Sequence, residues 1–436
     1  EEECMVASPI SAPPKKSGAS RIGGLVMWVF SIGLVVFLII VLVIRFTTPI
    51  PLFRLRIVKD IPLPSALTDP KSQDPLAPGL AVRFDHFDFQ ALDPPTHLLF
   101  MTHSGPNPDK AGSVNIQVDP ANDGNVLVFN TVQRKVVKLL SIPQTSGIVV
   151  APDIHWVYVS DAADGIIYGV DESTFRTVPI KLDPLDSPDA MTYDPVDHRI
   201  FVSDPGTPKS PDDANIALNN QNVAVIDVLN NTLVKKIPIG VDKPFGDDIG
   251  HVQYDITSHG VFVVTLPLHD QNIQPNPPVT PPSFVEVIDP NLLSVILKIK
   301  LPDTCVNPHG MAVDSDQETA FVVCIDSQKL VRINLRTLQP FPDASLQQLP
   351  AGCDIARLDH PLHVLFVGCT VGIAMFNEAG GQLTSLGSQF VGSSSNHTVF
   401  VNEETQELYV PITSAGNRPI LRILQYDPNG TESSGI

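Results

Sequence analysis

WVYVSD (156–161) and RIFVSD (199–204) belong to a set of seven similar short strands along this chain. The other five are LLFMTH (98–103), GVFVVT (260–265), TAFVVC (319–324), VLFVGC (364–369) and ELYVPI (407–412). Each follows a shorter apolar run and a turn, and each precedes another strand. A repeat of 43 to 61 residues built only of strands is typical of a β-propeller. The sequence therefore predicts an all-β fold with seven blades.

The two ends of the repeat indicate how the ring closes. The last repeat reaches its third strand at LRILQYD (421–427) and has no fourth. RLRIVKDIPL (54–63) resembles the fourth strands of other repeats, such as TLVKKIPI (232–239). Because a blade shared between both ends leaves no exposed sheet edge, we expect residues 54–63 to complete blade seven. The rest of the propeller is expected to span residues 83–436.

A membrane segment is predicted before the propeller. Residues 22–44 carry no charge and are numerous enough to cross a bilayer as a helix. The run is too long for the apolar part of a signal peptide, which indicates an uncleaved signal anchor. Basic residues lie on both sides of it, so they do not decide its orientation. Residues 1–21 are expected to be a disordered tail, and residues 45–82 a membrane-proximal linker that includes the closing strand.

Two features favour an extracytoplasmic propeller, on the periplasmic, luminal or extracellular side. Glycosylation sequons begin at Asn230, Asn396 and Asn429. Four of the five cysteines follow the apolar segment, and an oxidising compartment suits paired cysteines.

The net charge of −19 argues against a nucleic-acid partner, although acidity alone also keeps a domain soluble.

Strand register predicts how the cysteines pair. Cys353 and Cys369 fall directly opposite each other across the hairpin of the sixth repeat, where a disulfide is feasible. Cys305 and Cys324 are slightly out of register, so their bridge requires the preceding loop to fold back. The alternative is four free, buried thiols; the spacings match no zinc ribbon.

Alignment of the repeats brings a polar ring to one end of the central channel. The aligned positions are Asp88, Ser146, Asp189, Gly250, His309, Asp354 and His397, with His251 beside them. One interpretation is a divalent metal site whose ligands are His309, Asp354 and His397, with the metal's identity open. The other is a hydrated polar tunnel without a metal.

Three long connections crown the same face. They are residues 104–124, 205–222 and 269–283, each between the second and third strands of a blade. Loops that vary on a regular scaffold are where binding commonly occurs. No haem-attachment, P-loop, zinc-protease or serine-hydrolase motif is present in the sequence.

The strings WVYVSD, RIFVSD and ELYVPI, each followed by a strand like VAVIDV (223–228), resemble the YVTN-type β-propeller family. The resemblance covers residues 83–436, and NPHGMAVD (307–314) also resembles blade openings of NHL and gluconolactonase-like propellers. It implies a secreted or periplasmic propeller whose relatives include lactonases. Lactonase-like metal sites use Glu, Asn and Asp, whereas this ring offers Asp and His.

These observations favour a membrane-anchored, extracytoplasmic binding module, with residues 22–44 in lipid and a protein or small ligand on the loop face. Such a module suits an accessory subunit of a membrane complex. The alternative is a metal-dependent hydrolase or lyase acting at the channel mouth. A third hypothesis is a structural role in a surface layer. A fold this versatile does not choose among them.

Overall fold

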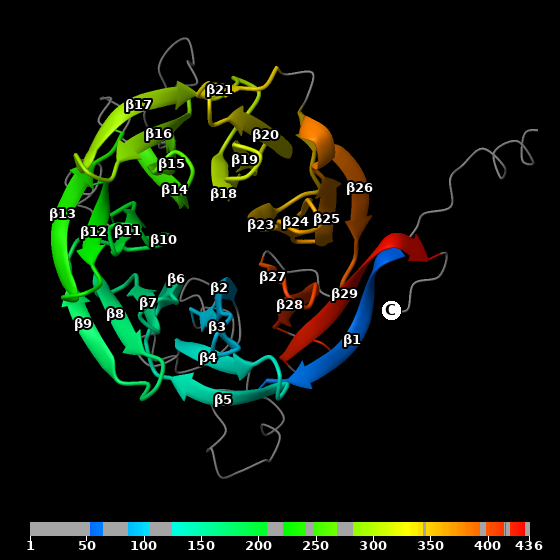
Figure 1. Ribbon diagram of the computed structural model, residues 1–436, viewed down its shortest axis with the longest axis horizontal. Helices are drawn as coiled ribbons and strands as arrows, with labels where there is room; N and C mark the ends of the chain where they lie inside the picture. Colours follow the sequence, from blue (N-terminus) through cyan, green and yellow to red (C-terminus); the bar gives the residue numbers. More distant parts are fainter. Residues whose placement is uncertain are drawn as a thin grey trace, which may run out of the picture. The chain divides into compact units, whose positions relative to one another are not determined.

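Seven β-sheets form a closed ring around a central axis (Figure 1). This computed structural model describes residues 53–63, 86–104, 124–206, 221–240, 247–267, 282–342, 346–392, 398–413, 415 and 419–431. All lie in the compact unit Phe53–Ile436. The apolar run 22–44 lies outside the described residues, and within them no helix has the length and apolar character needed to cross a bilayer.

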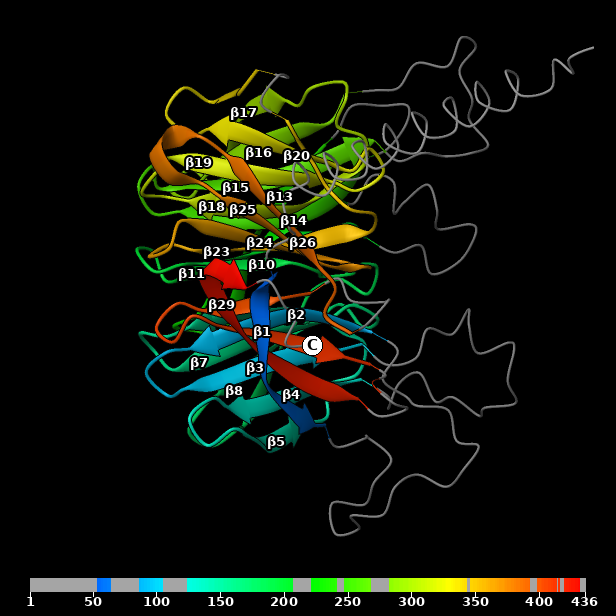
Figure 2. The same ribbon diagram turned by 90° about the vertical axis from the view of Figure 1, so that its right-hand side faces the viewer.

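Each blade is an antiparallel sheet whose strands follow one another from the axis outward (Figures 1 and 2). The strands of the first three blades are β2 (Phe87–Asp93), β3 (Leu98–His103), β4 (Asn125–Asn130), β5 (Lys135–Leu140); β6 (Thr145–Ala151), β7 (Trp156–Asp161), β8 (Ile166–Asp171), β9 (Thr177–Lys181); β10 (Met191–Asp194), β11 (Arg199–Asp204), β12 (Asn222–Asp227), β13 (Thr232–Pro238).

The strands of blades four to six are β14 (Asp247–Asp255), β15 (Gly260–Pro267), β16 (Phe284–Asp289), β17 (Ser294–Lys300); β18 (Pro308–Asp314), β19 (Thr319–Cys324), β20 (Lys329–Asn334), β21 (Gln339–Pro340), β22 (Gln347–Gln348); β23 (Cys353–Asp359), β24 (Val364–Cys369), β25 (Gly372–Asn377), β26 (Thr384–Gln389). In blade five, the outer position is divided between β21 and β22, which both pair with β20. A 3₁₀ turn, η3 (Ala379–Gly381), precedes β26.

Blade seven joins both ends of the described chain, as the sequence predicts. Its order is β1 (Phe53–Pro62), β29 (Ile420–Thr431), β28 (Glu407–Ile412) and β27 (Phe400–Asn402). β1 runs antiparallel to β29, and Leu55 is buried in the blade. Arg422 clamps the two strands, donating to both carboxylate oxygens of Asp60 at 2.8 and 2.6 Å.

The repeated second strand forms the core between blades. Its central position is always aromatic and almost fully buried: Phe100, Tyr158, Phe201, Phe262, Phe321, Phe366 and Tyr409. The turn before it also repeats, because one non-glycine residue in each blade adopts a positive φ of 48–57°: His97, His155, His198, His259, Glu318, His363 and Gln406. Histidine tolerates this left-handed conformation better than most residues, which gives these five histidines a backbone role. The repeat therefore specifies packing and turn geometry together.

Candidate functional site

β-bulges in the inner strands contain the residues of the polar ring. The register shifts lie between Phe87 and Gln90, Thr145 and Ile148, Ile249 and Val252, Pro308 and Met311, and Cys353 and Ala356. Each shift encloses a ring position. In blade three, Asp189 and Ala190 both bond to Ser203, which places two residues opposite one. Because a bulge re-aims side chains and often lies beside functional sites, this feature positions the ring.

Hydroxyl groups on the second strand satisfy the bulges of blades one to three. Gly147 N donates to Ser160 Oγ at 2.7 Å, and Phe89 N donates to Thr102 Oγ1 at 2.9 Å. Ser203 Oγ donates to the carbonyl of Ala190 at 3.3 Å in the equivalent place. The serine of the VSD strings thus stabilises the irregular backbone beside the ring.

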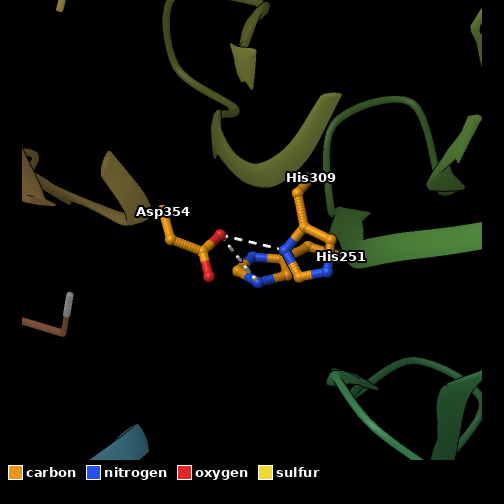
Figure 3. Close-up of side chains that lie close together, drawn as sticks. All are labelled: His251, His309 and Asp354. Carbon is orange, nitrogen blue, oxygen red and sulfur yellow. Dashed lines mark hydrogen bonds and ion pairs between the residues drawn. The ribbon is translucent and has the colours of Figure 1, made fainter. Parts of the chain in front are cut away.

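His251, His309 and Asp354 converge from three consecutive blades (Figure 3). His309 Nδ1 lies 2.9 Å from Asp354 Oδ1, and His251 Nε2 lies 3.8 Å from the same oxygen. The two imidazole rings meet edge to face at 5.1 Å between centroids. The His251 side chain is 0% exposed, whereas those of His309 and Asp354 are partly accessible. His309 and Asp354 are therefore brought together as predicted, and His251 lies beneath them.

The backbone determines the tautomer of His251. Met311 N donates to His251 Nδ1 at 3.3 Å, so Nδ1 holds a lone pair. Burial lowers the pKa of His251 to about 3, although the charge of Asp354 opposes the shift. A neutral imidazole with a lone pair on Nδ1 carries its proton on Nε2. His251 is thus a neutral donor whose Nε2 lies 3.8 Å from Asp354 Oδ1.

A second hydrogen-bonded group links blades one to three. Ser146 Oγ lies 2.6 Å from Asp88 Oδ2 and within hydrogen-bond distance of Asp189 Oδ1. A hydroxyl has one proton, so it satisfies both carboxylates only if one of them is protonated. Burial, then the charge of Asp88, raises the pKa of Asp189 to about 6. Above this pH both carboxylates are ionised, and the Ser146 hydroxyl can donate to only one of them.

The polar ring ends on apolar side chains. Phe89, from blade one, reaches His251, from blade four, with ring centroids 4.9 Å apart. One level further, Arg357 Nη2 donates across the axis to the Gln90 carbonyl at 3.4 Å, and burial lowers the pKa of Arg357 to about 10. Phe89 and Arg357 therefore connect blade one with blades four and six below the ring. Sequence comparison of the repeats missed Arg357, because no other blade carries a charge at its position.

The three converging residues fit a metal only in part. His309 Nδ1 lies 2.9 Å from Asp354 Oδ1, and a carboxylate orients many histidine ligands in this way. His251 does not fit, because metal binding at Nε2 would require both ring nitrogens to be unprotonated. His397, the third predicted ligand, lies outside the described residues.

Both predicted disulfides are present. Cys353 pairs with Cys369, and the two are direct register partners; Cys305 pairs with Cys324. The sequon residues Asn230 and Asn429 are exposed, whereas Asn396 lies outside the described residues. Most of each long connection also lies outside the described residues, and only the ends of 104–124, 205–222 and 269–283 are described.

A second His–Asp group occupies the turns at the opposite end of the inner strands. Asp194, Asp197 and His259 lie close enough to share an ion, and His259 Nδ1 lies 2.7 Å from Tyr254 Oη. The sequence signal is a tyrosine five residues before a turn histidine, repeated at Tyr193 and His198, which lie 3.1 Å apart. These groups bridge adjacent blades and carry no ligand assignment.

Comparison with known proteins establishes the fold alone. No family model matches the chain, and no curated protein matches it. Among solved structures it is similar to the hydrazine synthase of Kuenenia stuttgartiensis, with a TM-score of 0.54 and 14% identity over 81% of this chain and 99% of that one. The structure thus confirms a seven-bladed β-propeller, while the resemblance to the YVTN type stays an expectation.

Proposed function

We propose that this chain is an interaction module that binds a partner through the face containing the polar ring. The observation that supports it is where the long connections start. His103 ends β3 opposite Phe87, next to Asp88, and Thr265 lies opposite Ile249, next to Gly250. In blade three, β11 ends at Asp204, next to Ser203, whose carbonyl accepts from Asp189 N. The connections from blades one, three and four therefore leave the scaffold beside the ring, where a partner held by them would also contact the ring.

The stems of these connections are held in place. Asn125 Nδ2 lies 3.3 Å from His103 Nδ1, and Asn222 Nδ2 donates to Asp204 Oδ2 at 3.2 Å; all four side chains are buried. Rigid stems reduce the entropy lost when loops are ordered on binding. This supports recognition by loops on a fixed base.

Photo-crosslinking tests the proposal. A photoreactive amino acid at Ser104, beside the ring, is expected to give a discrete cross-linked partner in the membranes of the source cells. The same group at Asn230, in an exposed turn at the other end of blade three, is the matched control. Equal labelling from both positions, or none from Ser104, would contradict the proposal.

The same proposal places the propeller outside the cytoplasm, tethered by residues 22–44 in lipid, as an accessory subunit of a membrane complex. Its support is the pair of disulfides, which persist in oxidising compartments. In protein taken from source cells with thiols blocked at lysis, these four cysteines should react with alkylating reagent only after reduction. Immediate alkylation would rule out this location.

A metal-dependent hydrolase or lyase is the second candidate. The observation in its favour is the pairing of two candidate ligands, because His309 Nδ1 lies 2.9 Å from Asp354 Oδ1. It predicts stoichiometric metal in the purified chain, lost when His309 and His397 are both replaced by alanine. Elemental analysis of both proteins decides between an enzyme of this class and a metal-free binding module.

A further inference from the structure

The most informative group at the channel mouth is the Nε2–H of His251. Within the described part of the chain it has no hydrogen-bond partner, although the side chain is fully buried. Asp354 Oδ1 is 3.8 Å away, too far for a hydrogen bond, and lies 2.9 Å from His309 Nδ1. An unsatisfied buried donor costs about 1–3 kcal/mol. The site therefore gains from any ligand that brings an acceptor to this position.

The acceptor is not expected to be anionic. Three carboxylates lie near one another in the ring, because Asp189 feels the charges of Asp88 and Asp354 as well as that of His309. The Arg357 guanidinium lies one level deeper, bonded to the carbonyls of Ala356 and Gln90. A negatively charged ligand would meet the carboxylates first, in partly buried surroundings where charges interact strongly.

We propose that the channel mouth binds an organic ligand without negative charge through a carbonyl or hydroxyl oxygen, which accepts the hydrogen bond of His251 Nε2–H. The ligand's own N–H or O–H groups meet the acceptors of the ring, which are the carboxylates of Asp88 and Asp354 and the hydroxyl of Ser146. This ligand class rests on the proposed binding function and deepens it. It excludes His251 as a metal ligand, because the bond from Met311 N keeps the proton on Nε2.

Histidine-selective NMR of the whole chain tests the proposal with three probes. Acetamide is an uncharged carbonyl compound with donor hydrogens, acetate is its anionic counterpart of nearly equal shape, and Zn²⁺ tests the metal. Acetamide should shift the His251 Nε2–H resonance saturably. Acetate should bind about ten times more weakly, a factor that like-charge repulsion readily supplies. Zn²⁺ should leave the His251 Nε2 proton in place.

Three results would overturn the proposal: no shift with acetamide, tighter binding of acetate, or loss of the Nε2 proton with stoichiometric Zn²⁺. The variant His251→Phe should abolish the acetamide effect, measured on the ring of His309. That variant removes a buried polar contact and risks misfolding, so a second variant, Asp354→Asn, is needed. It removes one negative charge and should reduce the ratio of acetamide affinity to acetate affinity. His259→Asn, in the opposite turns, is the control, because asparagine also tolerates the positive φ of this position, and it should change the binding of neither compound.

The two proposals fail separately. Cross-linking from Ser104 with no acetamide response would remove the ligand class and leave the interaction module intact. An acetamide response without a cross-linked partner would keep the ligand class and remove the protein partner.

Discussion

At the scale of single residues, two hydroxyl groups each lie between a pair of carboxyl groups, and each arrangement favours protonation of one carboxyl. Thr96 Oγ1 lies 2.7 Å from Asp93 Oδ2 and 2.9 Å from Glu172 Oε2, between blades one and two. Its single proton serves one oxygen, so the other contact needs a protonated carboxyl. Burial raises the pKa of Glu172 to about 8, and the nearby Asp93 contributes. Ser146 stands between Asp88 and Asp189 in the same way.

Glu172→Gln should therefore stabilise the protein in alkali. Glu172 is protonated in the folded chain up to about pH 8 but ionises near pH 4 when unfolded, so wild-type stability falls as pH rises between these values. Glutamine keeps the shape without the titration. Its free energy of unfolding should exceed that of wild type by on the order of 1 kcal/mol at pH 9 and equal it near pH 4. Denaturant titrations at both pH values measure this, with the exposed Glu404→Gln as control; an equal gain at pH 4 would count against it.

The His360–Glu403 pair should stabilise the protein at acid pH and not at alkaline pH. A hydrogen bond to Glu403 raises the pKa of His360, and the two groups join blades six and seven at 2.6 Å. A raised histidine pKa gives stability that is complete below the unfolded value near 6.5 and is lost as pH rises through the folded value. Because both side chains are about 40% exposed, Glu403→Gln should cost only about 0.2–1 kcal/mol at pH 5 and nothing at pH 9. A loss that is independent of pH, measured by thermal unfolding, would refute the pairing.

At the scale of elements, the inner strands approach so closely that some positions exclude a side chain. A Cβ at Gly310 would lie 2.0 Å from the Asp354 carbonyl oxygen, and one at Gly147 would lie 1.7 Å from that of Asp189. In each case the carbonyl belongs to a ring residue of the next blade. Spacing between blades and placement of the ring are therefore set by the same glycines.

Gly310→Ala should both destabilise the protein and disturb the site. Overpacking of this kind costs roughly 1–3 kcal/mol, and here the backbone of Asp354 must move. Gly260→Ala is the control, because its nearest neighbour beyond adjacent residues is a serine hydroxyl 3.2 Å away. Unfolding titrations and the His309 resonances report stability and site geometry. Equal effects of the two substitutions would show that the close approach has no special role.

Much of the arrangement of the strands could be predicted from the sequence. The repeated strands, the closing strand and the Cys353–Cys369 pair followed from period and register, because strand pairing is periodic and local. The tautomer of His251 could not be predicted, because it depends on Met311 N of the next blade. Likewise, nothing in the local pattern around Arg357 indicates that it reaches across the axis to Gln90. Contacts between blades depend on the closed ring, which no single repeat contains.

At the scale of the whole molecule, stability depends on a joint between residues far apart in sequence. Leu55 is 1% exposed, and its backbone N–H donates to Gln389 Oε1 of blade six at 2.9 Å. Asp60 is bound on both oxygens by Arg422, whose Nη1 also donates to the Val391 carbonyl at 2.7 Å. β1 thus joins blade seven to blade six as well as closing its own sheet.

Weakening this joint should destabilise the ring as a unit. Leu55→Ala should lower the free energy of unfolding by about 2–5 kcal/mol, as expected for a buried leucine. Val58→Ala in the same strand, at a half-buried position, should cost less. Hydrogen exchange should then show faster exchange in β29 and β26 before the other blades. Uniform acceleration in all blades would mean that closure is no weaker than the rest of the ring.

The pairing of Phe53 with Thr431 has a consequence for biosynthesis. Contacts between such distant residues form slowly, because a long loop must be closed first. On the ribosome, the earliest strand emerges when its neighbour is still untranslated. It must wait unpaired, with Leu55 uncovered, until the C-terminal strand is released. Premature termination anywhere before β29 would therefore leave β1 without its pairing partner, a product that chaperones or proteases would recognise at its first strand.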